Sequence, residues 1–244
     1  MRRLKKHAKG FNWWSGLLLA TSLILAAALP SSGHVYIIIY ATLNGKTGHA
    51  GLAIDNYNII EKNETQDTVK LNTLTYYDLW PGKDGFGLFE FNKDHHPVFY
   101  TLPNAIWSSP ITVNSLYDQG IPHREYYPSD AILMLRTTPT ADYDLREYIE
   151  HIIETKTIFN PRFYNCSDFV LDGINYVTGL QLKAKEFIPF SFTTTPNKLC
   201  RRLVAFKNID IIKSPPQKIT RSFFRERVLK RKHRNQTTLL SQAY

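Results

Sequence analysis

Residues 163–170, Phe-Tyr-Asn-Cys-Ser-Asp-Phe-Val, combine the start signal of a helix with a cysteine. Asn165 is a favourable N-cap residue, and Asp168 follows three positions later, where a carboxylate can meet free backbone N–H groups. Apolar residues continue at helical spacing, and Gly179 is suited to end the helix. The sequence therefore predicts a helix that begins at Cys166 and ends near Gly179.

A cysteine in the first turn of a helix lies in the partial positive charge of the helix N-terminus, which favours the thiolate. Such a cysteine is a candidate nucleophile if a histidine can reach it. The alternative is a small apolar residue that packs under the helix, because free cysteines are commonly buried. The segment around Cys166 is compatible with both interpretations.

The formal net charge of +9 is concentrated at the two ends of the chain. Residues 1–33 carry five Lys or Arg and no acid, and residues 213–234 carry nine Lys or Arg and one acid. The body between them, residues 34–212, has a net charge of −4. A nucleic-acid-binding domain is expected to carry its basic patch within the fold, so we expect no nucleic-acid partner. With 43% hydrophobic residues in the chain, the body can bury one sizeable core.

The N-terminal segment, residues 1–33, has the pattern of a targeting sequence. Its basic residues precede an apolar run from Leu17 to Leu29, and Ala26-Ala27-Ala28 provides an A-x-A cleavage site. We expect a signal peptide or, as the alternative, an uncleaved N-terminal membrane anchor. Either one predicts an exported protein, periplasmic or membrane-anchored with its body facing the periplasm.

The C-terminal segment, residues 213–244, changes character after the Pro215-Pro216 pair. We expect a basic, partly disordered tail. Phenylalanines and aliphatic residues alternate with its Lys and Arg, so residues 213–234 are a candidate contact with an anionic membrane surface.

The first part of the body predicts strands around a histidine. The segments His34–Thr42 and Thr47–Ile54 are typical of strands, and Ile59–Lys62 is typical of a third. Asp55–Asn58 has the composition of a turn between the last two. Small residues beside His49 suggest that another backbone or a ligand comes close. The simplest model is an antiparallel hairpin that carries His49.

The rest of the body predicts an α+β fold, a small antiparallel sheet packed against helices. Residues 63–128 are expected to be loops and short elements over the core, with strand-like pieces at Phe86–Phe91 and Val98–Leu102 and short helices at Leu74–Trp80 and Thr112–Gln119. The patterns after them predict a strand, two helices and a last strand at Ala131–Arg136, Asp142–Thr155, Pro196–Leu203 and Val204–Ile212.

Cys166 and His49 form the candidate catalytic pair. A thiol nucleophile needs a neighbouring imidazole, and the imidazole needs a polar partner that fixes its orientation. A hairpin loop with an odd number of residues places Glu61 on the face of His49, and an even number favours Glu64, because a one-residue slip inverts the faces of a strand. We prefer Glu61, since Glu64 lies past the expected end of the strand.

The second cysteine opens a different interpretation. A disulfide between Cys166 and Cys200 would remove the nucleophile and leave a non-catalytic binding module of the cell envelope. No cofactor or metal is expected, because the chain contains no Gly-rich phosphate loop and no CxxC pair. His95 and His96 are adjacent, so in a strand they point to opposite faces and do not chelate one metal together.

Two motifs carry a resemblance to a known superfamily. A strand with Gly-His-Ala-Gly-Leu at residues 48–52 is followed by Tyr-Asn-Cys-Ser-Asp-Phe-Val at residues 164–170. This order resembles the circularly permuted NlpC-type papain-like cysteine domains, in which the histidine strand precedes the cysteine helix, as in the lecithin:retinol acyltransferase group. That group carries its third polar residue one strand after the histidine, which matches Glu61.

Within this superfamily, residues 34–203 are similar to the Lnb-type periplasmic domain associated with lipoprotein N-acylation. That domain has a signal segment, a V-Y-x-x-x strand, a G-H strand and an N-C helix in the order found here. Lnb-type proteins are expected to continue into membrane helices, whereas this chain ends in a basic tail.

The resemblance implies thiol-dependent acyl transfer or amide or ester hydrolysis at the bacterial cell envelope. Cys166 would attack a carbonyl and form a thioester, with His49 as base and acid, Glu61 as its orienting carboxylate and the Cys166 N–H in an oxyanion hole. The Lnb-type resemblance implies a lipid acyl ester as substrate. The wider NlpC-type class implies a peptide bond of the cell wall.

Overall fold

The computed structural model describes residues 32–42, 48–62, 65–82, 93–103, 105–106, 109–120, 128–188, 191–217 and 219. These residues belong to one compact unit that begins at Ser32. The unit is mixed α+β, as the sequence predicts. The expected targeting segment, most of the basic tail and the strand-like piece Phe86–Phe91 lie outside the described residues.

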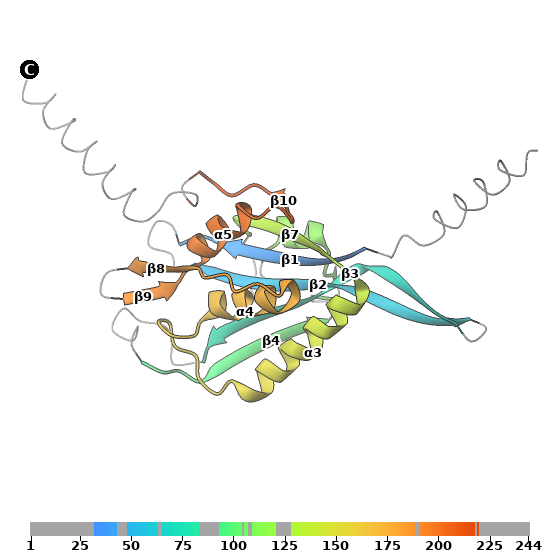
Figure 1. Cartoon of the computed structure of the whole chain (residues 1–244), viewed down its shortest axis with the longest axis horizontal. Coiled ribbons are helices and arrows are strands. Elements are labelled where there is room, and N and C mark those ends of the chain that lie inside the picture. Colours follow the sequence, from blue (N-terminus) through green and yellow to red (C-terminus); the bar gives the residue numbers. More distant parts are fainter. Residues whose placement is uncertain are drawn as a thin grey trace, which may run out of the picture. The chain divides into compact units, whose positions relative to one another are not determined.

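A six-stranded antiparallel sheet forms the centre of the unit, with the strand order β10-β7-β1-β2-β3-β4 (Figure 1). Its strands are β1 (Gly33–Tyr40), β2 (His49–Lys62), β3 (Thr65–Pro81), β4 (Pro97–Pro103), β7 (Ala131–Thr137) and β10 (Ile209–Lys213). Two small hairpins accompany it, formed by β5 (Ala105–Ile106) with β6 (Ser109–Pro110) and by β8 (Lys185–Ile188) with β9 (Ser191–Thr194).

The described residues contain four helices: α2 (Val113–Asp118), α3 (Pro139–Thr155), α4 (Cys166–Thr178) and α5 (Pro196–Val204). Each begins at a Thr or Asn whose side chain accepts a backbone N–H of the first turn. α4 ends at Gly179, whose φ of 66° is the left-handed conformation that glycine adopts without strain. The predicted positions of all four helices are confirmed. None of these helices is long and apolar enough to cross a membrane.

The sheet is covered on both faces, which explains the continuous apolar run in β1. Ile37 and Ile39 belong to the core beneath α3, α4 and α5. Ile38 and Tyr40 belong to a second core, which contains Leu116 of α2. Because successive residues of a strand point to opposite faces, a strand buried on both sides must be apolar at every position.

Two predictions between residues 55 and 80 were wrong. Asp55–Asn58 do not form a turn but continue β2, which has 14 residues and carries a bulge between Asp55 and Tyr57. The chain reverses between Lys62 and Thr65 instead. Leu74–Trp80 is not a helix but the second half of β3, whose backbone pairs with both β2 and β4. Residues 63–128 therefore supply two complete strands of the sheet and not only loops over it.

Candidate active site

The first turn of α4 positions Cys166. The side chain of Asn165 accepts the N–H groups of Ser167 (2.8 Å) and Asp168 (3.4 Å), and the Asp168 carboxylate accepts the N–H of Asn165 (3.1 Å). This reciprocal cap fixes the direction in which the chain enters the helix. Cys166 is the first helical residue, is 8% exposed, and lies where the helix favours negative charge.

Strand β9 holds the same end of α4 in place. The amide nitrogen of Asn165 donates to the backbone oxygens of Pro161 (2.9 Å) and Thr194 (3.1 Å). The Thr193 hydroxyl donates to the Pro161 oxygen (2.6 Å), and the Thr194 hydroxyl donates to the Asp168 carboxylate. The turn before Cys166 is thus attached to a neighbouring hairpin.

His49 is the first residue of β2 and is 4% exposed. Its backbone pairs with Tyr40 of β1, and the two rings are 5.8 Å apart. The indole ring of Trp80 lies on the other side, with its centroid 4.3 Å from the imidazole. The imidazole is therefore held between aromatic rings of the two neighbouring strands.

Asp78 of β3 is the carboxylate that binds His49. One of its oxygens, Oδ2, lies 3.0 Å from Nε2 of His49. The same oxygen accepts the hydroxyl of Tyr76 and the indole N–H of Trp80, both at 2.9 Å. Asp78 is fully buried, so these donors replace the water that a carboxylate needs. With Nε2 donating to Asp78, Nδ1 is the ring nitrogen left for Cys166.

Burial and the two neighbours Cys166 and Asp78 determine the pKa of His49. Burial has the largest effect and lowers this pKa. The charge of Cys166, side-chain hydrogen bonds to Asp78 and Cys166, and the charge of Asp78 together outweigh burial and raise the pKa to about 9. The imidazole is therefore protonated at neutral pH, with Asp78 bound at Nε2 and Cys166 as its other charged neighbour. The site combines a cysteine sulfur, a neighbouring acid and a buried orienting carboxylate.

The expected partnership of Glu61 with His49 is not found. Glu61 follows His49 by twelve positions in the same strand, and its backbone pairs with Gln66. At about 3.3 Å per residue, the two backbones are on the order of 40 Å apart along the strand. The prediction depended on a turn at Asp55–Asn58, which would have brought Glu61 back beside His49. Glu64, the alternative, lies outside the described residues.

Sequence reasoning missed Asp78 because it placed this segment in a short helix. The sequence Leu-Thr-Tyr-Tyr-Asp-Leu-Trp at residues 74–80 is rich in the threonine and aromatic residues that favour strands. In a strand alternate residues share a face, so this segment places Tyr76, Asp78 and Trp80 on the same side. That reading would have identified the carboxylate and both of its other donors.

Neither cysteine forms a disulfide, since both are free. The structure therefore does not contain the Cys166–Cys200 bond of the alternative interpretation. Burial is the main cause that raises the pKa of Cys200, to about 12, so this thiol is protonated at neutral pH and inert. Among the described residues, no three His, Cys, Asp or Glu side chains gather as metal ligands would. His95 pairs with Phe159 through its backbone.

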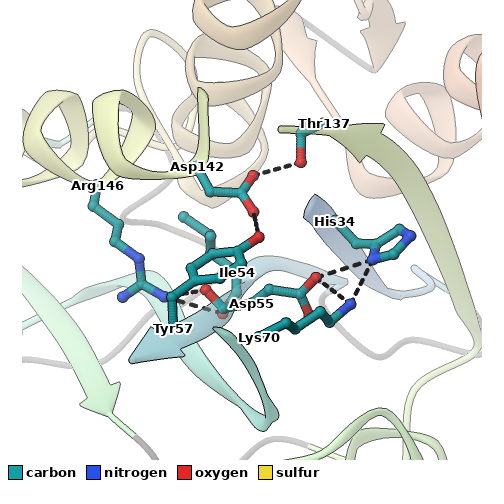
Figure 2. Close-up of polar contacts among 8 residues, drawn as sticks. All are labelled: His34, Ile54, Asp55, Tyr57, Lys70, Thr137, Asp142 and Arg146. Carbon is teal, nitrogen blue, oxygen red and sulfur yellow. Dashed lines mark hydrogen bonds and ion pairs between the residues drawn. The ribbon is translucent and has the colours of Figure 1, made fainter. Parts of the chain in front are cut away.

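A second polar cluster lies at the bulge of β2, among side chains from β1, β3, β7 and α3 (Figure 2). Asp55 is bound by His34 (2.9 Å) and by the ammonium group of Lys70, and Asp142 accepts the hydroxyls of Tyr57 and Thr137. Arg146 donates to the backbone oxygens of Ile54 (3.2 Å) and Asp55 (2.7 Å) and to the Asn56 side chain (2.7 Å). Ion pairs at Asp55 and hydrogen bonds at Asp142 and Arg146 join these elements, so the cluster is a structural network that fastens β2 to β3 and α3.

Comparisons with protein-family models, with curated proteins and with solved structures gave no match for this chain.

Proposed function

We propose that this protein is a thiol-dependent acyltransferase or hydrolase of the bacterial cell envelope, with Cys166 as nucleophile. The observation that carries the proposal is the position of the His49 imidazole, whose Nε2 lies 3.0 Å from Oδ2 of Asp78 and whose pKa is raised by the neighbouring Cys166. A permuted papain-like arrangement fits the order of these elements, a histidine strand before a cysteine helix that packs on an antiparallel sheet. Asp78 takes the orienting role expected of Glu61.

In the first step, the Cys166 sulfur attacks the carbonyl carbon of the substrate, and negative charge develops on the carbonyl oxygen. The N–H of Cys166 can donate to this oxyanion, because the Asn165 cap uses the N–H groups of Ser167 and Asp168 and not that of Cys166. The bond to the leaving group then breaks, and the leaving group takes the proton of His49. The product is a thioester on Cys166.

In the second step, an acceptor attacks the thioester carbon and gives its proton to His49. The acceptor is water for hydrolysis and an amine or alcohol for acyl transfer. Cys166 leaves as the thiolate beside the reprotonated imidazole. Asp78 keeps Nε2 occupied throughout, so the imidazole exchanges protons through Nδ1 only.

The location and the substrate are part of the proposal. The basic and apolar segment in residues 1–29 supports the proposed export of the protein, with its site in the periplasm or at the membrane facing it. Of the two substrate classes, a lipid acyl ester is favoured over a cell-wall peptide. Phe163, three residues before Cys166, is exposed, as are Phe187 and Phe192 of the hairpin that is hydrogen-bonded to the start of α4.

The proposal is tested with a thiol-alkylating probe and a p-nitrophenyl acyl ester on the full chain. Iodoacetamide should label Cys166, and Cys166→Ala should abolish both labelling and ester turnover. Cys200→Ala is the matched control and should retain both, because the Cys200 thiol is buried and protonated. His49→Gln should lower both rates. Full turnover by Cys166→Ala would contradict the proposal.

A further inference from the structure

Three phenylalanines are exposed around the start of α4. Phe163 lies in the turn before Cys166 and is 64% exposed. Phe187 and Phe192 face each other across β8 and β9, with ring centroids 5.2 Å apart, and are 42% and 64% exposed. Large apolar side chains that are exposed together indicate a partner surface.

Hydrogen bonds join the turn and the hairpin that carry these rings. Pro161, two residues before Phe163, accepts from the side chain of Thr193, the neighbour of Phe192. The hairpin lies at the same end of the molecule as the start of α4 (Figure 1). We call Phe163, Phe187 and Phe192 the aromatic rim.

Positive charges flank the aromatic rim. The guanidinium group of Arg162 lies 5.1 Å from the ring centroid of Phe163. Lys183 and Lys185 are exposed on the segment that leads to Phe187. The acid in this hairpin, Glu186, is neutralised by an ion pair with Arg201. Aromatic rings beside cations are the combination that binds the interface of an anionic bilayer.

We propose that the aromatic rim docks on an anionic phospholipid bilayer, with its rings at the level of the headgroups and Arg162, Lys183 and Lys185 against lipid phosphates. Docking there places the first turn of α4, with Cys166, at the lipid surface. This consequence rests on the proposed function, because it supplies a thiol acyltransferase with a lipid substrate. The docking itself requires no chemistry at Cys166.

The test maps where the full chain touches lipid. The protein is bound to vesicles of phosphatidylcholine and phosphatidylglycerol that contain a phospholipid with a photoactivatable diazirine in its acyl chain. Trypsin cuts after Lys and Arg, so Phe163 falls in peptide 163–183 and the other two rings fall in peptide 186–198. Ile59, which is 66% exposed, falls in peptide 47–62 and serves as the control. Because the label is located on individual peptides, the mapping shows which segments touch lipid even if residues 1–29 also anchor the chain.

Label is expected on peptides 163–183 and 186–198, above that on 47–62, and is expected to decrease when phosphatidylglycerol is omitted. The double variant Phe187→Ser, Phe192→Ser should lower the label on 163–183 about tenfold or more, since each buried ring contributes strongly to partitioning. Ile59→Ser should leave the label unchanged, and Phe192→Trp should retain it. Equal labelling of the three peptides, or no effect of the double variant, would overturn the inference.

Two further measurements separate the remaining outcomes. A lipid-free dimer in sedimentation velocity that the double variant abolishes would show that the rim binds a second copy of this chain, and would overturn membrane docking. Alkylation of Cys166 by iodoacetamide without vesicles should be the same in the double variant and the wild type. If Cys166 alkylation proves independent of His49 while the lipid label persists on the rim, the proposed function fails and the docking inference stands.

Discussion

Nε2 of His49 lies 3.0 Å from Oδ2 of Asp78, which β3 places opposite Gly51 of β2. This oxygen also accepts from Tyr76 and Trp80, so three donors stabilise the carboxylate in its fully buried position. A fixed negative charge at Nε2 does two things for the imidazole. It orients Nδ1 toward Cys166, and it stabilises the protonated ring.

The first prediction is that Asp78→Asn moves the alkaline limb of the pH–rate profile to lower pH. The wild-type limb is expected near pH 9, where His49 loses the proton that the leaving group needs. Asparagine can still accept from Nε2 but carries no charge, so the pKa of His49 should fall. At pH 8 the loss of rate should be on the order of a hundredfold, within the range that general acid–base catalysis contributes. The measurement is kcat/KM between pH 5 and 10 for an alkyl ester, whose alkoxide leaving group needs the proton of His49.

Asp67→Asn, an exposed change in the same strand, should leave that profile unchanged. The raised His49 pKa also has a consequence for folding. Its contribution to stability is fully present below the unfolded pKa of 6.5 and is lost as the pH rises through about 9. Asp78→Asn should reduce this loss, measured by urea unfolding at pH 6 and pH 9.5. An unshifted alkaline limb in Asp78→Asn would argue against Asp78 as the orienting residue.

The second prediction concerns Gly51, whose position in β2 leaves no room for a side chain. A Cβ at this position would lie 2.5 Å from the hydroxyl oxygen of Tyr76 and 2.8 Å from Cζ of the same ring. Tyr76 is fully buried, so Gly51→Ala must displace the ring that donates to Asp78. We expect a loss of about 1–3 kcal/mol in the free energy of unfolding, as for overpacked cores.

Gly51→Ala should also slow ester turnover, because the displaced ring withdraws one donor from the site. Gly179→Ala is the control. Its Cβ would meet no atom within 4 Å, but its φ of 66° makes alanine unfavourable. That variant should lose about 1–2 kcal/mol of stability and keep its turnover. Equal effects of the two variants on turnover would refute the link from Gly51 to Asp78.

The third prediction separates the stability of α4 from the reactivity of Cys166. Asn165→Ala removes the cap of α4 together with the bonds from Asn165 to Pro161 and Thr194. The expected cost is about 1 kcal/mol in unfolding free energy, with slower alkylation of Cys166 because the first turn is no longer held. Thr138→Ala removes the corresponding cap of another helix, α3. It should lower stability by a similar amount without slowing alkylation, measured with iodoacetamide by mass spectrometry.

The parts of the fold that the sequence predicted correctly depend on local signals. β1 is apolar at every position, and α4 is bounded by Asn165 and Gly179, so each is specified by residues within its own segment. The prediction of a nucleophile at Cys166 and a base at His49 used the same kind of signal. The contact between them, more than a hundred positions apart, is visible only in the folded chain.

The errors concern residues whose conformation is set by distant partners. Asp55 and Asn56 have turn chemistry, but Lys70 and His34 bind Asp55, and Thr75 and Arg146 bind the Asn56 side chain. These bonds stabilise an extended backbone, so β2 continues through a bulge. Glu61 was chosen as the third residue because that error had brought it beside His49. Tertiary contacts outweighed local propensity at this point.

The last prediction follows from the buried carboxyl of Asp142. Burial is the main cause that raises its pKa to about 6; the hydrogen bonds from Thr137 and Tyr57 and the charge of Arg146 lower it, and the charge of Asp55 raises it. Between the unfolded pKa of 3.8 and about 6 the folded state binds more protons than the unfolded state, so stability should fall as the pH rises through this window. Above pH 6 the cost reaches roughly 3 kcal/mol, at about 1.4 kcal/mol per pKa unit.

Asp142→Asn keeps an acceptor for Thr137 without a charge, and should therefore be more stable than the wild type at pH 8 and lack the decline between pH 4 and 6. Asp144→Asn, an exposed change two positions away, should behave as the wild type. Urea midpoints from pH 4 to pH 8 measure all three proteins, and parallel curves for wild type and Asp142→Asn would show that this carboxyl does not oppose folding.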